Sequence, residues 1–189
     1  AKLGKEAKII AKMNSLCDPI IIRALYDASL AGVKIELIIR GICSLKAGIP
    51  GLSENITVRS IVGNFLEHAR IFYFYNDGWE DVYMGSADWM PRNLDKRVEI
   101  TFPVEDELLK REVIEILNLQ LADNVKAHIL QKDGSYTKID LRGKKKVNSQ
   151  DIFCEKKKKN AELDIDNIKK RTFEPVEGPD VKKYKLNNK

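Results

Sequence analysis

One helix signal followed directly by one strand signal restricts the fold of this chain more than any other feature. Asp18-Pro19 offers an N-cap residue followed by proline at the first helical position, and apolar residues then recur at helical spacing as far as Gly32. Val33–Ile39 is apolar and largely β-branched, which predicts a buried strand that ends at Arg40. A helix that leads into a buried strand is half of a βαβ unit and favours an α/β fold.

The segments around this unit have the same mixed character. Residues 5–14 are typical of a strand or a strand end, and Gly41–Asn55 is rich in glycine and proline, which predicts a loop. Because this loop leaves the carboxyl end of a strand, it lies where open α/β sheets bind ligands. Four more strands and a helix are predicted at Ile56–Ser60, Ala69–Tyr75, Asp81–Ser86, Arg97–Pro103 and, for the helix, about Glu105–Leu121. The fold class is therefore α/β, a mixed sheet flanked by helices.

Charge and hydropathy divide the chain into a body and a tail. Its 189 residues are 43% hydrophobic, which is enough for one ordinary core. Residues 1–140 carry 18 Lys+Arg against 20 Asp+Glu, whereas residues 141–189 carry 15 against 8. The hydrophobic pattern weakens from about Ile129, and few apolar residues follow that could offset chain entropy. We expect a folded domain over residues 1–155 and a basic, flexible tail over residues 156–189.

Several classes of protein are excluded by what the sequence lacks. No run of about 18 apolar residues occurs, and no apolar signal core follows the basic start, so we expect neither a membrane span nor secretion. Cys17, Cys43 and Cys154 are odd in number and widely spaced, unlike a disulfide framework or a CxxC metal pair. These features predict a cytoplasmic protein with reduced thiols.

Two groups of polar residues are candidates for chemistry. His68 stands just before an apolar strand, and Arg70 lies on the same strand face two residues later. An imidazole beside a guanidinium can hold or accept a phosphate, although a histidine at a strand start can equally be satisfied by a backbone carbonyl.

The second group runs from Gly85 to Glu99. Its small residues allow backbone to approach a ligand closely, and its polar residues include Ser86, Asp88, Arg92, Asn93 and Arg97. The alternative is an everyday strand end followed by a solvated charged face.

The order of these two groups resembles half of a phospholipase D superfamily site. That pattern is His-x-Lys, a spaced Asp and Gly-Ser-x-Asn, and here it corresponds to His68-x-Arg70 and Gly85-Ser86-Ala87-Asp88. Arg70 replaces the lysine, Tyr75 falls near the expected aspartate, and Asp88 stands where asparagine is usual. The resemblance implies a phospholipase-D-like domain, and the departures argue against phosphodiester hydrolysis.

A closer resemblance covers roughly residues 8–155. The chain resembles bacterial polyphosphate kinase in several short motifs that occur in one order: Lys12-Met13-Asn14-Ser15-Leu16, Ala31-Gly32-Val33, Arg40-Gly41-Ile42-Cys43, Gly51-Leu52-Ser53-Glu54-Asn55, Ser60-Ile61-Val62, Leu66-Glu67-His68 and Ser86-Ala87-Asp88-Trp89-Met90. The family has two phospholipase-D-like domains at its C-terminus, and the chain resembles the last of them.

This resemblance implies a mechanism and a set of residues. A histidine in the preceding domain takes the terminal phosphate of ATP and passes it to polyphosphate, and neither His68 nor His128 sits in the motif of that histidine. Arg40 and His68 correspond to family residues that contact the nucleotide's phosphates, and His68 is also the candidate catalytic residue. Possible supporting residues are Arg70, Ser86, Asp88, Arg92 and Arg97.

The same resemblance implies ATP or ADP as ligands, with Mg²⁺ held outside this chain and no metal ligand within it. The expected partners are polyphosphate and the remaining domains of a longer enzyme, assembled as a homo-oligomer, so the chain alone should be inactive. Two alternatives remain open: a non-enzymatic module that binds polyanions through its lysine-rich tail, and a phospholipase-D-like phosphodiesterase.

Overall fold

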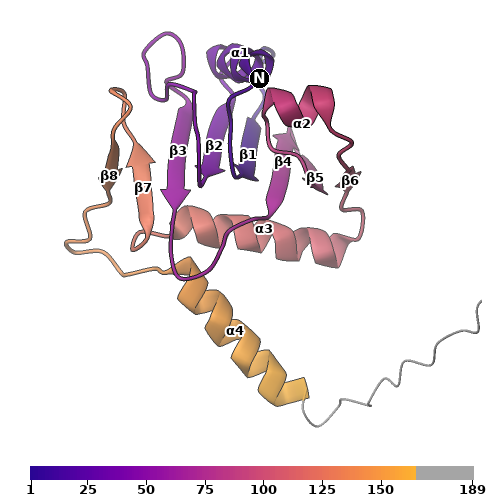
Figure 1. Ribbon diagram of the computed structural model, residues 1–189, viewed down its shortest axis with the longest axis vertical. Coiled ribbons are helices and arrows are strands. Elements are labelled where there is room, and N and C mark those ends of the chain that lie inside the picture. Colours follow the sequence, from indigo (N-terminus) through magenta and orange to yellow (C-terminus); the bar gives the residue numbers. More distant parts are fainter. Residues whose placement is uncertain (165–189) are drawn as a thin grey trace, which may run out of the picture. The chain divides into compact units, whose positions relative to one another are not determined.

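The computed structural model describes residues 1–164, of which Ala1–Phe153 form a compact unit with a sheet of eight strands and helices packed on it (Figure 1). The strand order is β6-β5-β4-β1-β2-β3-β7-β8. β2 pairs in parallel with β1 and β3, and the other neighbours are antiparallel. The predicted α/β class with a mixed sheet is thus confirmed. The strands are β1 Ala7–Met13, β2 Lys34–Ile39, β3 Ile56–Ile61, β4 Arg70–Asn76, β5 Trp79–Gly85, β6 Thr101–Pro103, β7 Ala127–Leu130 and β8 Tyr136–Lys138.

Aspartate side chains cap the two helices that pack against the sheet. The carboxylate of Asp18 accepts hydrogen bonds from two backbone N–H groups at the start of α1, and Asp106 does the same for α3. The helices are α1 Pro19–Leu30, α2 Pro91–Lys96, α3 Glu107–Ala122 and α4 Ser149–Asp164. Among the described residues, no helix combines the length and the apolar character needed to cross a membrane.

The central strands are buried on both faces, because their successive residues point to opposite sides and an apolar cluster lies on each side. Leu37 and Ile39 of β2 belong to a cluster that includes Leu25 of α1. Ile38 of the same strand belongs to the other cluster, which includes Leu117 of α3. This explains why the central strands read as nearly continuous apolar runs.

One edge of the sheet collects the strand ends that carry the polar motifs. The parallel strands β1 and β2 end at this edge, and the register that pairs Met13 with Ile39 places Asn14 and Arg40 next to each other. β4 starts at the same edge and β5 ends there, since Arg70 pairs with Gly85. Four segments far apart in sequence therefore meet at one place.

The predicted strand over Arg97–Pro103 is wrong at its beginning. Residues 91–96 form helix α2, Arg97 is its C-cap, and only Thr101–Pro103 pairs with β5. Pro91 favours the start of α2, because proline has the backbone angle of a first helical residue and needs no hydrogen-bond donor there.

The C-terminal region contains more structure than the sequence analysis expected. The hairpin of β7 and β8 follows the point where the hydrophobic pattern weakens. Helix α4 continues past residue 156 to Asp164, so the first part of the expected flexible tail is helical. The compact body comprises Ala1–Phe153. The domain division at residue 155 stays a prediction, and residues 165–189 lie outside the described part of the chain.

Candidate functional site

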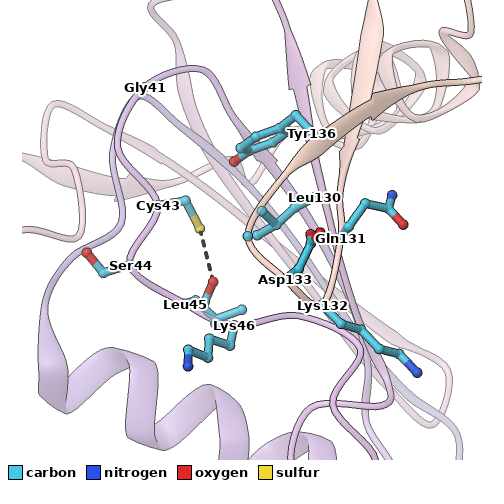
Figure 2. A pocket seen from close by; sticks show the side chains of 11 residues that line it. Gly41, Cys43, Ser44, Leu45, Lys46, Leu130, Gln131, Lys132, Asp133 and Tyr136 are labelled. Atoms are coloured by element: carbon cyan, nitrogen blue, oxygen red, sulfur yellow. Dashed lines mark hydrogen bonds between the residues drawn. The ribbon is translucent and has the colours of Figure 1, made fainter.

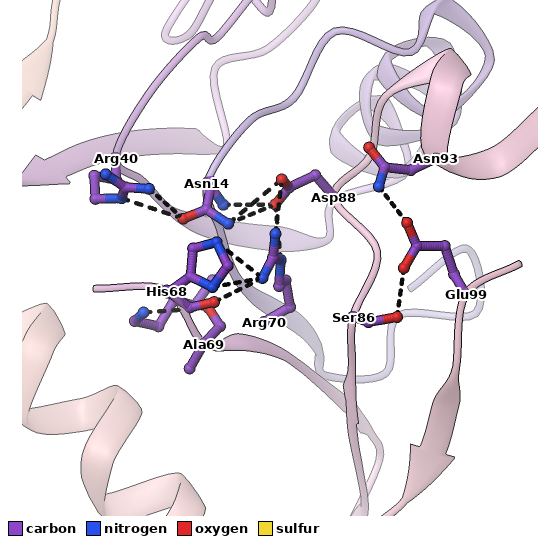
Figure 3. Close-up of polar contacts among 10 residues, drawn as sticks. Asn14, Arg40, His68, Ala69, Arg70, Ser86, Asp88, Asn93 and Glu99 are labelled. Atoms are coloured by element: carbon purple, nitrogen blue, oxygen red, sulfur yellow. Dashed lines mark hydrogen bonds and ion pairs between the residues drawn. The ribbon is translucent and has the colours of Figure 1, made fainter. Parts of the chain in front are cut away.

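Asn14 joins two charged side chains at the polar edge of the sheet (Figure 3). Its Oδ1 accepts hydrogen bonds from Nε and Nη2 of Arg40 at 3.2 and 2.8 Å. Its Nδ2 and its backbone N–H donate to Oδ1 of Asp88 at 3.1 and 2.8 Å. Because a side-chain amide both accepts and donates, one buried residue fixes a cation on one side and an anion on the other.

Asp88 is paired on its other side with Arg70. Nε and Nη2 of the guanidinium donate to the two carboxylate oxygens, each at 3.1 Å, in a bidentate geometry. Burial raises the pKa of Asp88, but the hydrogen bonds from Arg70 and Asn14 outweigh this effect, so the pKa lies below the usual value. Asp88 is therefore an ionised carboxylate that orients Arg70.

His68 is exposed and lies at the end of this series of hydrogen bonds, next to Arg70. Nη1 of Arg70 is 3.1 Å from His68 Nδ1 and 3.4 Å from His68 Nε2, and it donates to the His68 carbonyl oxygen at 2.9 Å. A guanidinium can only donate, so a ring nitrogen that binds Arg70 acts as an acceptor. The ring nitrogen that carries the proton can donate to an anionic ligand.

The connected residues carry more positive than negative charge. We call Arg40, Asn14, Asp88, Arg70 and His68 the edge network. It contains two guanidinium groups and one carboxylate. Nη1 of Arg40 takes part in none of the hydrogen bonds found among the described residues. Fixed donors with an excess positive charge are suited to binding an anion such as a phosphate group.

The remaining predicted residues, Ser86, Arg92 and Arg97, lie outside the edge network. The hydroxyl of Ser86 donates to Glu99, and Asn93 donates to the other oxygen of the same carboxylate. These hydrogen bonds, with that from Ser86 first, lower the pKa of Glu99. Arg92 and Arg97 are exposed on α2 and at its C-cap, and in the described part of the chain no hydrogen bond connects them to the edge network.

Sequence reasoning named four of the five residues of the edge network but assigned no role to Asn14. The available signal was position, because a polar residue directly after a buried strand lies at the edge where ligands bind. Lys12 and Glu67 were also given no role. Lys12 is 2% exposed, and its Nζ lies 3.3 Å from Glu67 Oε2. Burial lowers the pKa of this lysine, and the charge of Glu67 opposes that shift.

The edge network does not suit a magnesium ion. Magnesium needs several oxygen ligands, and both carboxylate oxygens of Asp88 already accept hydrogen bonds from Arg70 and Asn14. Among the described residues there is no group of three or more His, Cys, Asp or Glu side chains that could hold a metal ion.

A cavity of about 400 Å³ lies between the loop that follows β2 and the β7–β8 hairpin (Figure 2). Its lining combines apolar Leu45 and Leu130 with polar Asp133 and Tyr136, a mixture common in small-molecule sites. The cavity begins at Gly41, next to Arg40, but it includes no side chain of the edge network. We therefore place the candidate site at the edge network.

Comparison with known proteins identifies the family of this chain. Residues 1–150 match the family described as polyphosphate kinase C-terminal domain 2. The chain belongs to this family. The resemblance noted in the sequence is confirmed.

The relatives agree with this assignment. A polyphosphate kinase from Burkholderia ambifaria (strain MC40-6) is 61% identical over 137 residues, which are 72% of this chain and 20% of that protein. A polyphosphate kinase from Paraburkholderia phytofirmans is 57% identical over 151 residues, 79% of this chain and 22% of the relative. The crystal structure of polyphosphate kinase from Porphyromonas gingivalis superposes with a TM-score of 0.81 at 43% identity, covering 86% of this chain and 25% of that one. The chain thus spans about a fifth of the length of the curated relatives it matches.

Proposed function

We propose that this chain supplies the phosphate-binding part of a polyphosphate kinase site that moves the terminal phosphate of ATP reversibly to a growing polyphosphate chain. The observation that carries the proposal is the edge network, which joins Arg40 and His68 through three buried or half-buried side chains. Family membership supports the choice of ATP and polyphosphate among possible anions.

In the proposed reaction, an imidazole nitrogen of a histidine in another domain attacks the terminal phosphorus of ATP, and this histidine becomes the phosphohistidine. A P–N bond forms, the P–O bond to ADP breaks, and ADP leaves with the electron pair. In the second step the terminal oxygen of polyphosphate attacks the same phosphorus and the P–N bond breaks. Such transfers depend mainly on positioning and on fixed positive charge around the phosphoryl oxygens.

Arg40 and His68 have separate tasks in this scheme. Arg40 supplies permanent positive charge beside the phosphates, held in place by Asn14. His68 donates a hydrogen bond from its ring N–H to a phosphate oxygen, and it can also act as a proton donor. Magnesium that accompanies ATP would be bound outside the described residues. A homo-oligomer and a cytoplasmic location belong to the same proposal.

The phosphodiesterase alternative has less support from the geometry. In this chain the positions of the superfamily's lysine and asparagine are occupied by Arg70 and Asp88, and these two side chains pair with each other. The side chains of Arg70 and Asp88 therefore belong to the edge network. The polyanion-binding alternative rests on the lysine-rich tail, most of which lies outside the described residues.

The test is substitution in the full-length protein that carries this chain. Arg40→Ala and His68→Ala should each lower ATP-dependent polyphosphate synthesis by roughly ten- to hundredfold or more, because each change removes charge-assisted hydrogen bonds. His68→Gln separates the two roles of the imidazole, since glutamine can donate a hydrogen bond but cannot relay a proton. Near-normal activity of this variant would indicate a phosphate contact alone.

Matched controls are available on the same chain. Arg142 is an exposed arginine that pairs with Asp140, and His128 lies on β7 with Nδ1 near the Lys126 carbonyl oxygen. Arg142→Ala and His128→Ala should leave synthesis within about twofold of the wild-type rate. Wild-type turnover by both Arg40→Ala and His68→Ala at limiting and saturating ATP would reject the proposed function.

A further inference from the structure

The loop that carries His68 is fixed on both sides of the histidine, although the imidazole itself is exposed. Before it, the backbone of Phe65 and the carboxylate of Glu67 are hydrogen-bonded to other elements. After it, Lys12 Nζ donates to the carbonyl oxygen of Ala69 at 3.2 Å. The position of the imidazole is thus determined by contacts that its neighbours make.

Gln150, in the first turn of α4, makes most of these contacts. Its Oε1 accepts from the Phe65 N–H at 3.1 Å, and its Nε2 donates to the Phe65 carbonyl oxygen at 2.9 Å. The same Nε2 lies 3.0 Å from Glu67 Oε1 and donates to it. One amide therefore binds the loop at two residues, three and one positions before His68.

Glu67 is held from a second direction by α3. Gln120 Nε2 donates to Glu67 Oε2 at 2.7 Å, and the same oxygen lies 3.3 Å from Lys12 Nζ. Gln120 is 1% exposed and Gln150 is 4% exposed. Buried polar groups are costly unless paired, so the hydrogen bonds from Gln120 Nε2 and Gln150 Nε2 strongly restrict the position of the Glu67 carboxylate.

The helix turn that presents Gln150 is itself anchored. The backbone N–H and the hydroxyl of Ser149 both donate to Asp123 Oδ2 at 2.8 Å. The other oxygen of Asp123 accepts from backbone N–H groups at the start of β7. A side chain supported in this way can hold a catalytic loop within the small tolerance that catalysis requires.

We infer that Gln150 is a positioning residue for His68: it acts on phosphoryl transfer through the loop residues Phe65 and Glu67, without touching the substrate. The inference rests on the proposed function. It predicts a loss of rate that depends on His68, since a displaced group can cost a large factor in rate without changing the binding of distant groups.

The decisive experiment is a double-mutant cycle in the full-length protein. Gln150→Ala should lower kcat about tenfold and leave the KM for ATP within about twofold, because Arg40 keeps its contacts with Asn14. His68→Ala combined with Gln150→Ala should be no slower than His68→Ala alone, within about twofold. Gln131→Ala on the β7–β8 hairpin is the matched glutamine control and should have wild-type kinetics.

Gly63→Ala provides a second route to the same change. A Cβ atom at Gly63 would lie 2.3 Å from Gln150 Oε1, so the amide must move away from the loop. Because only the end of a flexible side chain is displaced, this variant should stay folded and should reproduce the loss of kcat. The thermal midpoint of each variant, measured in parallel, separates a general loss of structure from a local displacement.

The possible outcomes test the role of Gln150 and the proposed function separately. If the effects of Gln150→Ala and His68→Ala multiply in the double variant, Gln150 acts by stability or by another route and the inference is overturned. Wild-type kcat for Gln150→Ala and Gly63→Ala would overturn it as well, while leaving the proposed function intact. If His68→Ala keeps full activity, His68 has no role in the reaction, and any loss caused by Gln150→Ala then contradicts action through His68; the proposed function itself fails only if Arg40→Ala is also fully active.

Discussion

At the scale of residues, each group of the edge network is hydrogen-bonded to the next one. Arg40 is bound by the oxygen of Asn14, Asp88 by its nitrogen, and Arg70 by Asp88. The sequence predicted four of these five side chains, because strand ends and a family motif marked them. It could not predict the role of Asn14, since the partner of a side-chain amide depends on which strands become neighbours.

The pairing of Asp88 with Arg70 makes a prediction about stability. Asp88→Asn keeps the shape of the side chain but removes the charge that compensates a guanidinium whose side chain is only 13% exposed. Breaking a buried pair by changing one partner costs about 3 kcal/mol, so the free energy of unfolding at pH 7 should fall by about that amount. Denaturant unfolding of the wild-type and variant chains measures the difference. Asp140→Asn, at an exposed pair, is the control and should change stability little.

The charged pair of Asp88 and Arg70 also predicts how the effect of Asp88→Asn on stability depends on pH. The folded-state pKa of Asp88 lies below its usual value, so the ionised carboxylate stabilises the folded chain above the unfolded-state pKa of about 3.9. This contribution is lost as the pH falls through the folded-state pKa. The stability difference between wild type and Asp88→Asn should therefore be constant near neutral pH and shrink in acid below about pH 3.9. A difference that grows in acid would contradict the charged pair.

At the scale of elements, the central strands were predicted well because their apolar runs are buried on both faces. The elements that sequence reasoning missed lack such runs. The turn of the β7–β8 hairpin contains Asp133-Gly134, a common hairpin signal, but the strands beside it are short. Helix α4 is rich in lysine and glutamate, which are good helix formers, whereas the analysis relied on apolar periodicity.

The two parts of α4 should differ in their effect on stability. Removing residues 156–189 should leave the thermal midpoint nearly unchanged, because residues 156–158 are exposed and the compact body ends at Phe153. Removing residues 149–189 should lower the midpoint by many degrees, because Asp123 loses Ser149 and Glu67 loses Gln150. Differential scanning calorimetry of the two truncated chains tests this contrast. Equal midpoints would show that the first turn of α4 adds no stability.

At the scale of the whole molecule, the body and the basic tail differ in charge, so in the proposed function they should contribute differently to binding polyphosphate. Residues 156–189 carry 11 Lys+Arg against 6 Asp+Glu, and binding through them should weaken with salt. Removing residues 156–189 should reduce this salt-dependent component of polyphosphate binding, measured by fluorescence anisotropy at low and high ionic strength. An unchanged salt dependence would assign the binding to the body.

In the proposed function the edge network is only one side of a phosphoryl-transfer site, which leads to a prediction for the isolated chain. It offers cationic and hydrogen-bond donors at one sheet edge, but in-line transfer also needs a nucleophile on the far side of the phosphorus. We expect the 189-residue chain, incubated with magnesium and ATP labelled in its terminal phosphate, to form neither polyphosphate nor an acid-labile phosphoprotein. The full-length protein under the same conditions is the positive control. A label on the isolated chain that disappears in His68→Ala would show that His68 itself accepts the phosphate, and the assignment of the phosphohistidine to another domain would be wrong.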